Sequence, residues 1–168
     1  MSYWRLSHRA DPIARLLADR HYNRQKPGTP QFVPPGRCLV LLSKDEQALW
    51  VTSWPFAEYV KHAWKGAWVN SLFRREQFAT GLASDLILEA IAITRGYFGE
   101  PPSLGMITFV DSEKIKSSNP GCCYKYAGFV KAGYAKDGKV CLQLTPERMP
   151  LPRTPPPIIA RLKKGAKK

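Results

Sequence analysis

Apolar and polar positions along the chain alternate in short blocks that predict strands more often than helices. Residues 38–43 (CLVLLS) and 48–54 (ALWVTSW) are apolar runs separated by the polar residues 44–47, a pattern that predicts a hairpin. Residues 67–76 predict a third strand, and residues 104–111 predict a strongly apolar fourth. These four runs are expected to form the centre of a β-sheet.

Two segments have helical spacing instead. Residues 11–19 place Asp11 as a helix N-cap and Pro12 at the first helical position, followed by an apolar stripe. Residues 84–99 form the clearest helix of the chain, with Ser84 as the candidate N-cap.

The C-terminal third predicts a short helix over residues 120–129 and a hairpin over residues 129–145 with a Lys-Asp-Gly-Lys turn. The resulting order is helix, hairpin, strand, helix, strand, short helix, hairpin. This order is typical of an α/β or α+β fold with one central mixed β-sheet flanked by helices.

The composition changes at the end of the chain. Residues 1–146 contain the whole predicted pattern, and their number suits one domain. Residues 147–168 are rich in proline and end in the basic sequence RLKKGAKK, so they are interpreted as an extended, detachable basic tail.

The charge balance indicates a polyanionic partner. The 168 residues include 26 Lys and Arg against 13 Asp and Glu, which gives a net charge of +13. Seven of these cations lie at or beyond Arg148. Such an excess favours binding to DNA, RNA, an anionic membrane surface or a phosphate-rich cofactor.

Several classes of protein are excluded by the sequence. No apolar run is long enough to span a membrane, and the first residues lack the apolar core of a secretory signal. The four cysteines form no CxxC pair and the three histidines no HxH or HxxxH pair, so no metal site is predicted. The cysteines are interpreted as reduced thiols of a cytosolic protein.

The strongest functional signal lies in residues 67–129, where strand, glycine-containing loop, helix and strand predict a βαβ unit. The N-terminus of the helix would offer free N–H groups to an anion such as a cofactor pyrophosphate. Gly81 and Ser84 lie at this turn, just after Arg74 and Arg75. The alternative is a plain turn with solvated arginines, because short glycine loops are weak signals.

Three side chains are candidates for acid–base chemistry. Asp111 ends the most apolar strand and could accept a proton, although an Asp there also caps turns. Tyr124 could donate a proton, although a lone Tyr more often packs. His21, beside Tyr22 in the Pro/Gly-rich loop, could act as a base or be merely exposed.

A cluster of tryptophans among cations suggests nucleic-acid binding. Exposed aromatic rings can stack on unpaired bases while neighbouring lysines hold phosphates. The alternative is that most of these rings lie in the core. The candidates for nucleic-acid contact are Trp54, Lys61, Trp64, Lys65 and Arg75.

The arrangement resembles the GNAT acyltransferase fold, and YKYAGF (124–129) is similar to its C-terminal Tyr-x-x-x-Gly-Phe signature. Within that superfamily the chain most resembles the Mom family, phage enzymes that modify adenine in DNA. The segments that carry this resemblance span about residues 15–145: HYN (21–23), NSLFR (70–74), GLAS (81–84), TFVD (108–111) and NPGCCYKYAGFVKAG (119–133). Two departures are a longer loop from Gln77 to Gly81 and Thr-Phe-Val-Asp in place of Ser-Tyr-Ala-Asp.

The resemblance implies an enzyme that transfers a carbamoylmethyl- or glycyl-like group to the N6 amine of adenine, and so protects phage DNA from restriction. It implies a base or amine-orienting role for Asp111, a proton-donating role for Tyr124 and a pocket-lining role for His21 and Tyr22. Ser84, with Gly81 and Arg74, is expected to bind the donor. Double-stranded DNA and an acyl donor are the implied partners, in a bacterial host cytoplasm.

Other functions stay open at this point. One is an ordinary acetyl-CoA-dependent N-acetyltransferase that acts on a protein, a small amine or aminoacyl-tRNA. Another is a basic protein that binds nucleic acid without catalysis. The sequence also leaves open the acyl donor (acetyl-CoA or an aminoacyl-tRNA), any metal, and the oligomeric state, for which a homodimer is one arrangement.

Overall fold

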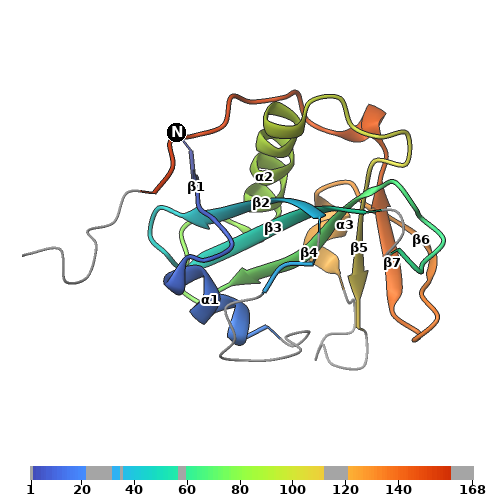
Figure 1. Ribbon diagram of the computed structural model, residues 1–168, viewed down its shortest axis with the longest axis horizontal. Coiled ribbons are helices and arrows are strands. Elements are labelled where there is room, and N and C mark those ends of the chain that lie inside the picture. The colour runs from blue at the N-terminus through green and yellow to red at the C-terminus, as the bar shows by residue number, and fades with distance from the viewer. Residues whose placement is uncertain (1, 22–31, 35, 57–59, 112–120, 160–168) are drawn as a thin grey trace, which may run out of the picture.

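The computed structural model describes residues 2–21, 32–34, 36–56, 60–111 and 121–159. In these residues seven strands form one mixed sheet in the order β1-β2-β3-β4-β5-β7-β6, with three α-helices (Figure 1). The strands are β1 (Trp4–Leu6), β2 (Gly36–Ser43), β3 (Ala48–Pro55), β4 (Trp68–Arg75), β5 (Met106–Val110), β6 (Val130–Tyr134) and β7 (Val140–Leu144); the helices are α1 (Pro12–Asp19), α2 (Ala83–Phe98) and α3 (Cys122–Tyr126). A mixed α+β fold is thereby established.

The predicted order of elements is confirmed within a few residues at each boundary. Asp11 is the N-cap of α1, and its carboxylate accepts a hydrogen bond from the Ile13 amide. The predicted N-cap Ser84 is wrong, because α2 begins at Ala83 and its N-cap is Leu82, which makes no side-chain cap. The sequence also gave no sign of β1, whose three residues are too few for a periodic pattern.

Only the central strands β4 and β5 are parallel; the other neighbouring strands are antiparallel. α2 connects them, as the predicted βαβ unit requires, and lies on one face of the sheet (Figure 1). Because the C-terminal ends of parallel strands lie at one edge, β4 and β5 deliver their following residues to the same place.

The sheet buries apolar side chains on both faces. α2 packs over a core that includes Trp50, Trp68 and Met106, and its six consecutive residues from Glu89 to Thr94 are buried. α1 covers the opposite face, where its residues Ala14 and Leu17 meet β2 and β3. At about 25 cal/mol per Å² of buried apolar surface, such burial is the main force that holds the layers together.

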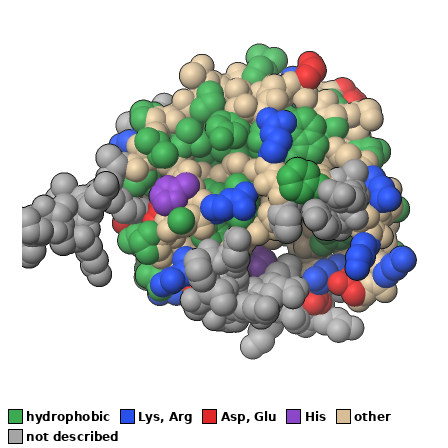
Figure 2. Space-filling view, in the orientation of Figure 1, with side chains coloured by type: hydrophobic (Ala, Val, Ile, Leu, Met, Phe, Trp, Pro, Cys, Tyr) green, Lys and Arg blue, Asp and Glu red, His purple; other side chains and the backbone are tan. Residues whose placement is uncertain are grey.

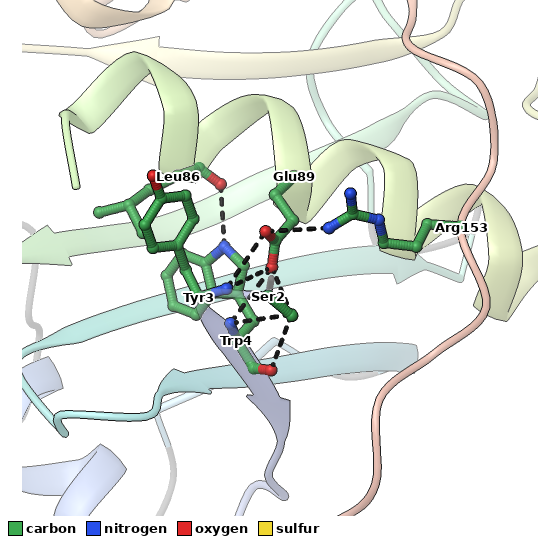
Figure 3. A network of polar contacts seen from close by, with 6 residues as sticks. All are labelled: Ser2, Tyr3, Trp4, Leu86, Glu89 and Arg153. Carbon is green, nitrogen blue, oxygen red and sulfur yellow. Dashed lines mark hydrogen bonds and ion pairs between the residues drawn. The ribbon is translucent and has the colours of Figure 1, made fainter. Parts of the chain in front are cut away.

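A buried carboxylate ties the N-terminus to α2 (Figure 3). Glu89 accepts hydrogen bonds from the Ser2 hydroxyl at 2.6 Å, the Tyr3 amide at 2.9 Å and the Trp4 amide at 3.2 Å. Arg153 forms an ion pair with the same side chain at 3.0 Å. A charge buried to this extent needs such partners, so Glu89 fixes both β1 and the C-terminal segment on the helix.

The prediction that the tail is detachable is wrong for residues 149–159. Met149 is buried, and the Arg153 amide donates a hydrogen bond to the Ala92 carbonyl of α2. Further along, Ile158 forms a parallel bridge with Leu6 of β1. The segment therefore crosses α2 and reaches the far edge of the sheet (Figure 1), and residues 160–168 lie outside the described residues.

Candidate active site

The parallel strands β4 and β5 separate after a short paired stretch. They pair only over Trp68–Asn70 and Met106–Thr108, although β4 continues to Arg75 and β5 to Val110. A bulge in β4 coincides with the separation: Thr52 of β3 is opposite Asn70, and Val51 is opposite Leu72, which leaves Ser71 as the extra residue. Bulges bend the strand that carries them, so this one opens a gap in the sheet.

A cavity of about 160 Å³ occupies this gap. Its size is close to that of an apolar cavity of about 150 Å³ that holds one benzene ring. Its lining comes from β4, β5, α3 and the end of α1, and consists of His21, Asn70, Ser71, Leu72, Phe73, Thr108, Phe109, Val110, Cys123 and Tyr124. The cavity therefore suits one ring or the edge of a larger base.

Tyr124 and Asn70 form the polar centre of this cavity. The Tyr124 hydroxyl donates a hydrogen bond to Asn70 Oδ1, and Asn70 Nδ2 donates to the carbonyls of Val51 at 3.0 Å and Leu72 at 2.9 Å. Thr108 Oγ1 lies 3.3 Å from the same Asn70 Oδ1. Because both amide protons of Asn70 are used by backbone carbonyls, its oxygen must face Tyr124.

His21 lies at the cavity as a neutral imidazole. Burial, aided by the positive charges of Arg74 and Lys139, lowers its pKa from 6.5 to about 4. A neutral imidazole has one N–H donor and one acceptor nitrogen. At neutral pH this side chain therefore offers both kinds of hydrogen bond to a bound group and adds no charge.

Cys123 also lines the cavity, but burial raises its pKa. The thiol therefore stays protonated at neutral pH and is a weak nucleophile. In the described part of the chain, no three side chains of His, Cys, Asp and Glu are grouped as metal ligands.

The structure brings two of the four predicted catalytic residues together. His21 and Tyr124 both line the cavity. Asp111 follows the lining residue Val110 at the end of β5, but is not itself part of the lining. Tyr22 lies outside the described residues.

The predicted donor loop between β4 and α2 is held by groups of the protein itself. The Arg75 guanidinium donates hydrogen bonds to the carbonyls of Ala79 and Gly81, at 2.9 Å and 2.8 Å. The Thr80 amide donates to the Asp45 carboxylate at 2.8 Å. Burial raises the pKa of Asp45, but hydrogen bonds from Ser43, Thr80 and Gln47 outweigh that effect and lower it.

Gly81 is required by the conformation of this loop. Its φ is +90°, and a Cβ there would lie 2.7 Å from the Tyr3 ring. Ser84 and Gly81 are not among the lining residues of the cavity, so the predicted donor-binding residues lie apart from Tyr124.

Arg74 is engaged at the side of the cavity. Its guanidinium pairs with Glu76 at 2.6 Å, and Arg20 pairs with the same carboxylate at 2.8 Å. These two guanidinium groups lower the pKa of Glu76, chiefly through the hydrogen bond from Arg74. The positive charge of Arg74 nevertheless helps to lower the pKa of His21.

The predicted stacking residues prove to be packed. The Trp54 ring contacts Trp68 and Phe98 at centroid distances of 5.8 and 5.5 Å, and the Arg37 guanidinium lies 4.9 Å above it. Trp54 is thus half-buried against these rings, and its contact with nucleic acid stays a prediction.

Trp64 is half-buried and packs against Phe109 at 6.0 Å. Lys61 and Lys65 are exposed nearby. They flank Trp64, which packs on the lining residue Phe109 and lies beside Gly133 of β6, and Arg75 is occupied by loop carbonyls. Because Trp54 packs with the core under α2 and Trp64 with a separate cluster, the five predicted nucleic-acid contacts do not form one face.

Asn70 is the cavity residue that the sequence did not assign a role. The segment NSLFR was singled out, but Asn70 itself was expected to be an ordinary strand position. A signal was present, because Asn is depleted in strands and a polar residue in a buried strand needs partners. Those partners are non-local, so only the fold identifies them.

Comparison with protein-family models, with curated proteins and with solved structures finds no match to this chain. No helix in the described ranges is both long and apolar enough to cross a bilayer.

Proposed function

We propose that this chain is a DNA-modifying acyltransferase of the Mom type, in the GNAT superfamily, which transfers an acyl-type group to the N6 amine of adenine. The observation that carries the proposal is the cavity at the separated ends of β4 and β5, because it places Tyr124 and His21 beside a space of ring size. The resemblance described above, with the strand–helix–strand unit around this cavity, adds support.

The size of the cavity fits the amine-bearing edge of a base better than a whole nucleotide. An adenine inside a duplex is not accessible, so it would have to leave the base stack at a cost of a few kcal/mol. The net charge of +13 supplies the attraction to phosphates that such binding requires.

The reaction needs a proton acceptor and a proton donor. The adenine nitrogen forms a bond to the acyl carbon, the bond from that carbon to the donor's leaving group breaks, and the amine loses one proton. Asp111, next to the lining residue Val110, is proposed to take this proton. Tyr124 is proposed to give its proton to the leaving group, and neutral His21 to orient the base.

The donor is proposed to be acetyl-CoA or an aminoacyl-tRNA. A phosphate bound at the loop between β4 and α2 would compete with Asp45 for the Thr80 amide. The Asp45 carboxylate thus already occupies the Thr80 amide, and a donor phosphate that binds at this loop must displace it.

Mass spectrometry of nucleosides tests the proposal. DNA from bacteria that express the chain should contain a deoxyadenosine of increased mass, and Tyr124→Phe should lower its amount about 100-fold or more. Tyr97→Phe, the same change at an exposed position of α2, should not. An unmodified DNA with acylated protein or tRNA would instead indicate an N-acetyltransferase with another substrate.

A further inference from the structure

We infer that the outer surface of α3 and β6 is the face that binds the phosphates of duplex DNA. This inference rests on the proposed function, and it relocates the nucleic-acid contacts from the tryptophan segment to the C-terminal part of the sheet. Figure 2 shows Lys and Arg side chains near the lower right of the molecule, where β6 and β7 lie in Figure 1.

The first observation is the exposure of large side chains in this part of the fold. Tyr126 of α3 is 80% exposed, and Tyr134 of β6 is 59% exposed. Lys131 and Lys136 are exposed beside them. Tyrosine hydroxyls and lysines are both common phosphate contacts in protein–DNA complexes, so the composition of the face fits a phosphate backbone.

The second observation is that these side chains share one side of the sheet with α3. Lys131 is opposite Leu142 and Tyr134 is opposite Val140 in the pairing of β6 with β7. Cross-strand partners point to the same face; Leu142 belongs to the core under α2 and α3, and Val140 packs against that core. Lys131 and Tyr134 therefore project on the side where α3 lies.

The third observation is that α3 joins the face to the site. Its residues Cys123 and Tyr124 line the cavity, and Tyr126, two residues later, is exposed. Lys139, at the end of the β6–β7 turn, is close enough to lower the pKa of His21. A duplex held on this face would thus lie beside the helix that carries Tyr124.

Charge complementarity selects the partner. Residues 121–148 contain five cations and two acids, so their net charge is 5 − 2 = +3. Lys131 contacts the ring and hydroxyl of Tyr134, with its nitrogen 4.2 Å from the ring centroid. An ammonium has three N–H donors, so this contact orients Lys131 and leaves donors for phosphate oxygens. A second copy of the chain would bring like charges together here, so we assign the face to DNA.

Binding of a fluorescent 20-bp duplex, measured by anisotropy over a range of salt concentrations, tests the inference. Lys131→Ala combined with Lys136→Ala should weaken binding about tenfold and reduce the salt slope by about two, one for each phosphate contact. Arg5→Ala combined with Lys44→Ala removes the same charge from exposed positions in β1 and just after β2, at the opposite edge of the sheet from β6, and should change affinity less than about twofold.

Three results would overturn the inference: equal losses in the two double variants, a larger loss in the Arg5/Lys44 variant, or wild-type binding to tRNA but not to duplex DNA. Nucleoside analysis separates this question from the reaction. Binding that depends on Lys131 and Lys136 without a modified deoxyadenosine would retain the inference and reject the proposed function. A modified deoxyadenosine, together with unchanged DNA binding in the Lys131/Lys136 variant, would retain the proposed function and reject the inference.

Discussion

The Tyr124 hydroxyl donates a hydrogen bond to Asn70 Oδ1 between α3 and β4, with the two oxygens 2.5 Å apart. Asn70 is in turn fixed by two backbone carbonyls on its amide nitrogen. The arrangement makes Tyr124 a residue whose hydroxyl is positioned before any ligand binds. Such preorganisation is what electrostatic and acid–base catalysis require.

Replacement of Asn70 should separate structural from chemical roles. Asn70→Ala removes the partner of two buried carbonyls, so we expect the free energy of unfolding to fall by about 2–4 kcal/mol in urea titrations. Tyr124→Phe removes a single hydrogen bond and should cost about 1 kcal/mol, while it abolishes modification. Equal stability losses in both variants would contradict this assignment.

Protonation of His21 should destabilise the fold in mildly acidic solution. Its pKa is lowered from 6.5 to about 4, so between these values the unfolded chain binds the proton and the folded chain does not. Stability should therefore fall as the pH falls from 7 to 5, by about 1–2 kcal/mol from this residue.

The matching variant is His21→Gln, which should remove this part of the pH dependence in unfolding titrations at pH 5 and 7. His62, whose pKa is also lowered by burial, supplies the comparison. His62→Gln should leave the contribution of His21 intact. An unchanged difference between the two pH values in His21→Gln would reject a neutral, buried imidazole.

Asp111→Asn should slow modification about 100-fold at neutral pH, because the amide cannot accept the amine proton. The readout is the amount of modified deoxyadenosine relative to the amount of soluble protein. Asp85→Asn is a matched control, since Asp85 lies exposed in the first turn of α2. Modification at the wild-type rate in Asp111→Asn would remove Asp111 from the mechanism.

Gly96→Ala should be destabilising, although alanine normally favours a helix by up to about 1 kcal/mol over glycine. A Cβ at Gly96 would lie 1.9 Å from the Arg153 carbonyl oxygen, so the C-terminal segment would have to move off α2. Limited proteolysis should then cleave this segment faster. A raised melting temperature would show that the segment does not pack on Gly96 in solution.

Glu89→Ala should cost about 2–4 kcal/mol, because it removes the acceptor of the Ser2 hydroxyl and of the Tyr3 and Trp4 amides. Arg153→Gln should cost about 1 kcal/mol or less, since the Arg153 side chain is half exposed and solvent screens the pair. Thermal unfolding of both variants measures the difference. Similar losses would mean that the ion pair, and not the amide contacts, carries the effect.

Local pattern was enough to predict most elements of this fold. The apolar run of β5, the N-cap Asp11 of α1 and the turn between β6 and β7 are all determined by neighbours in sequence. The parallel pairing of β4 with β5 followed from the helix between them. These features need no knowledge of distant residues.

The site depended on contacts that sequence patterns do not report. The separation of β4 from β5 follows a bulge at Ser71, a position that nothing in the alternation of residues distinguishes. The packing of Trp54 depends on Phe98, the last residue of α2. The tail looked detachable because its prolines suit no helix, but proline still suits an extended segment along a helix.

The outer strands of the sheet are shielded in two different ways. Beside β1, the Leu6 amide donates to the Pro157 carbonyl, and the Ile159 amide donates to the Leu6 carbonyl. Beside β7, the register of β6 shifts between Lys131 and Gly133, so the outermost strand is irregular and carries a charge. Long, regular edges serve as templates for aggregation. The C-terminal segment thus protects the folded chain from polymerising strand by strand, whatever its cations bind.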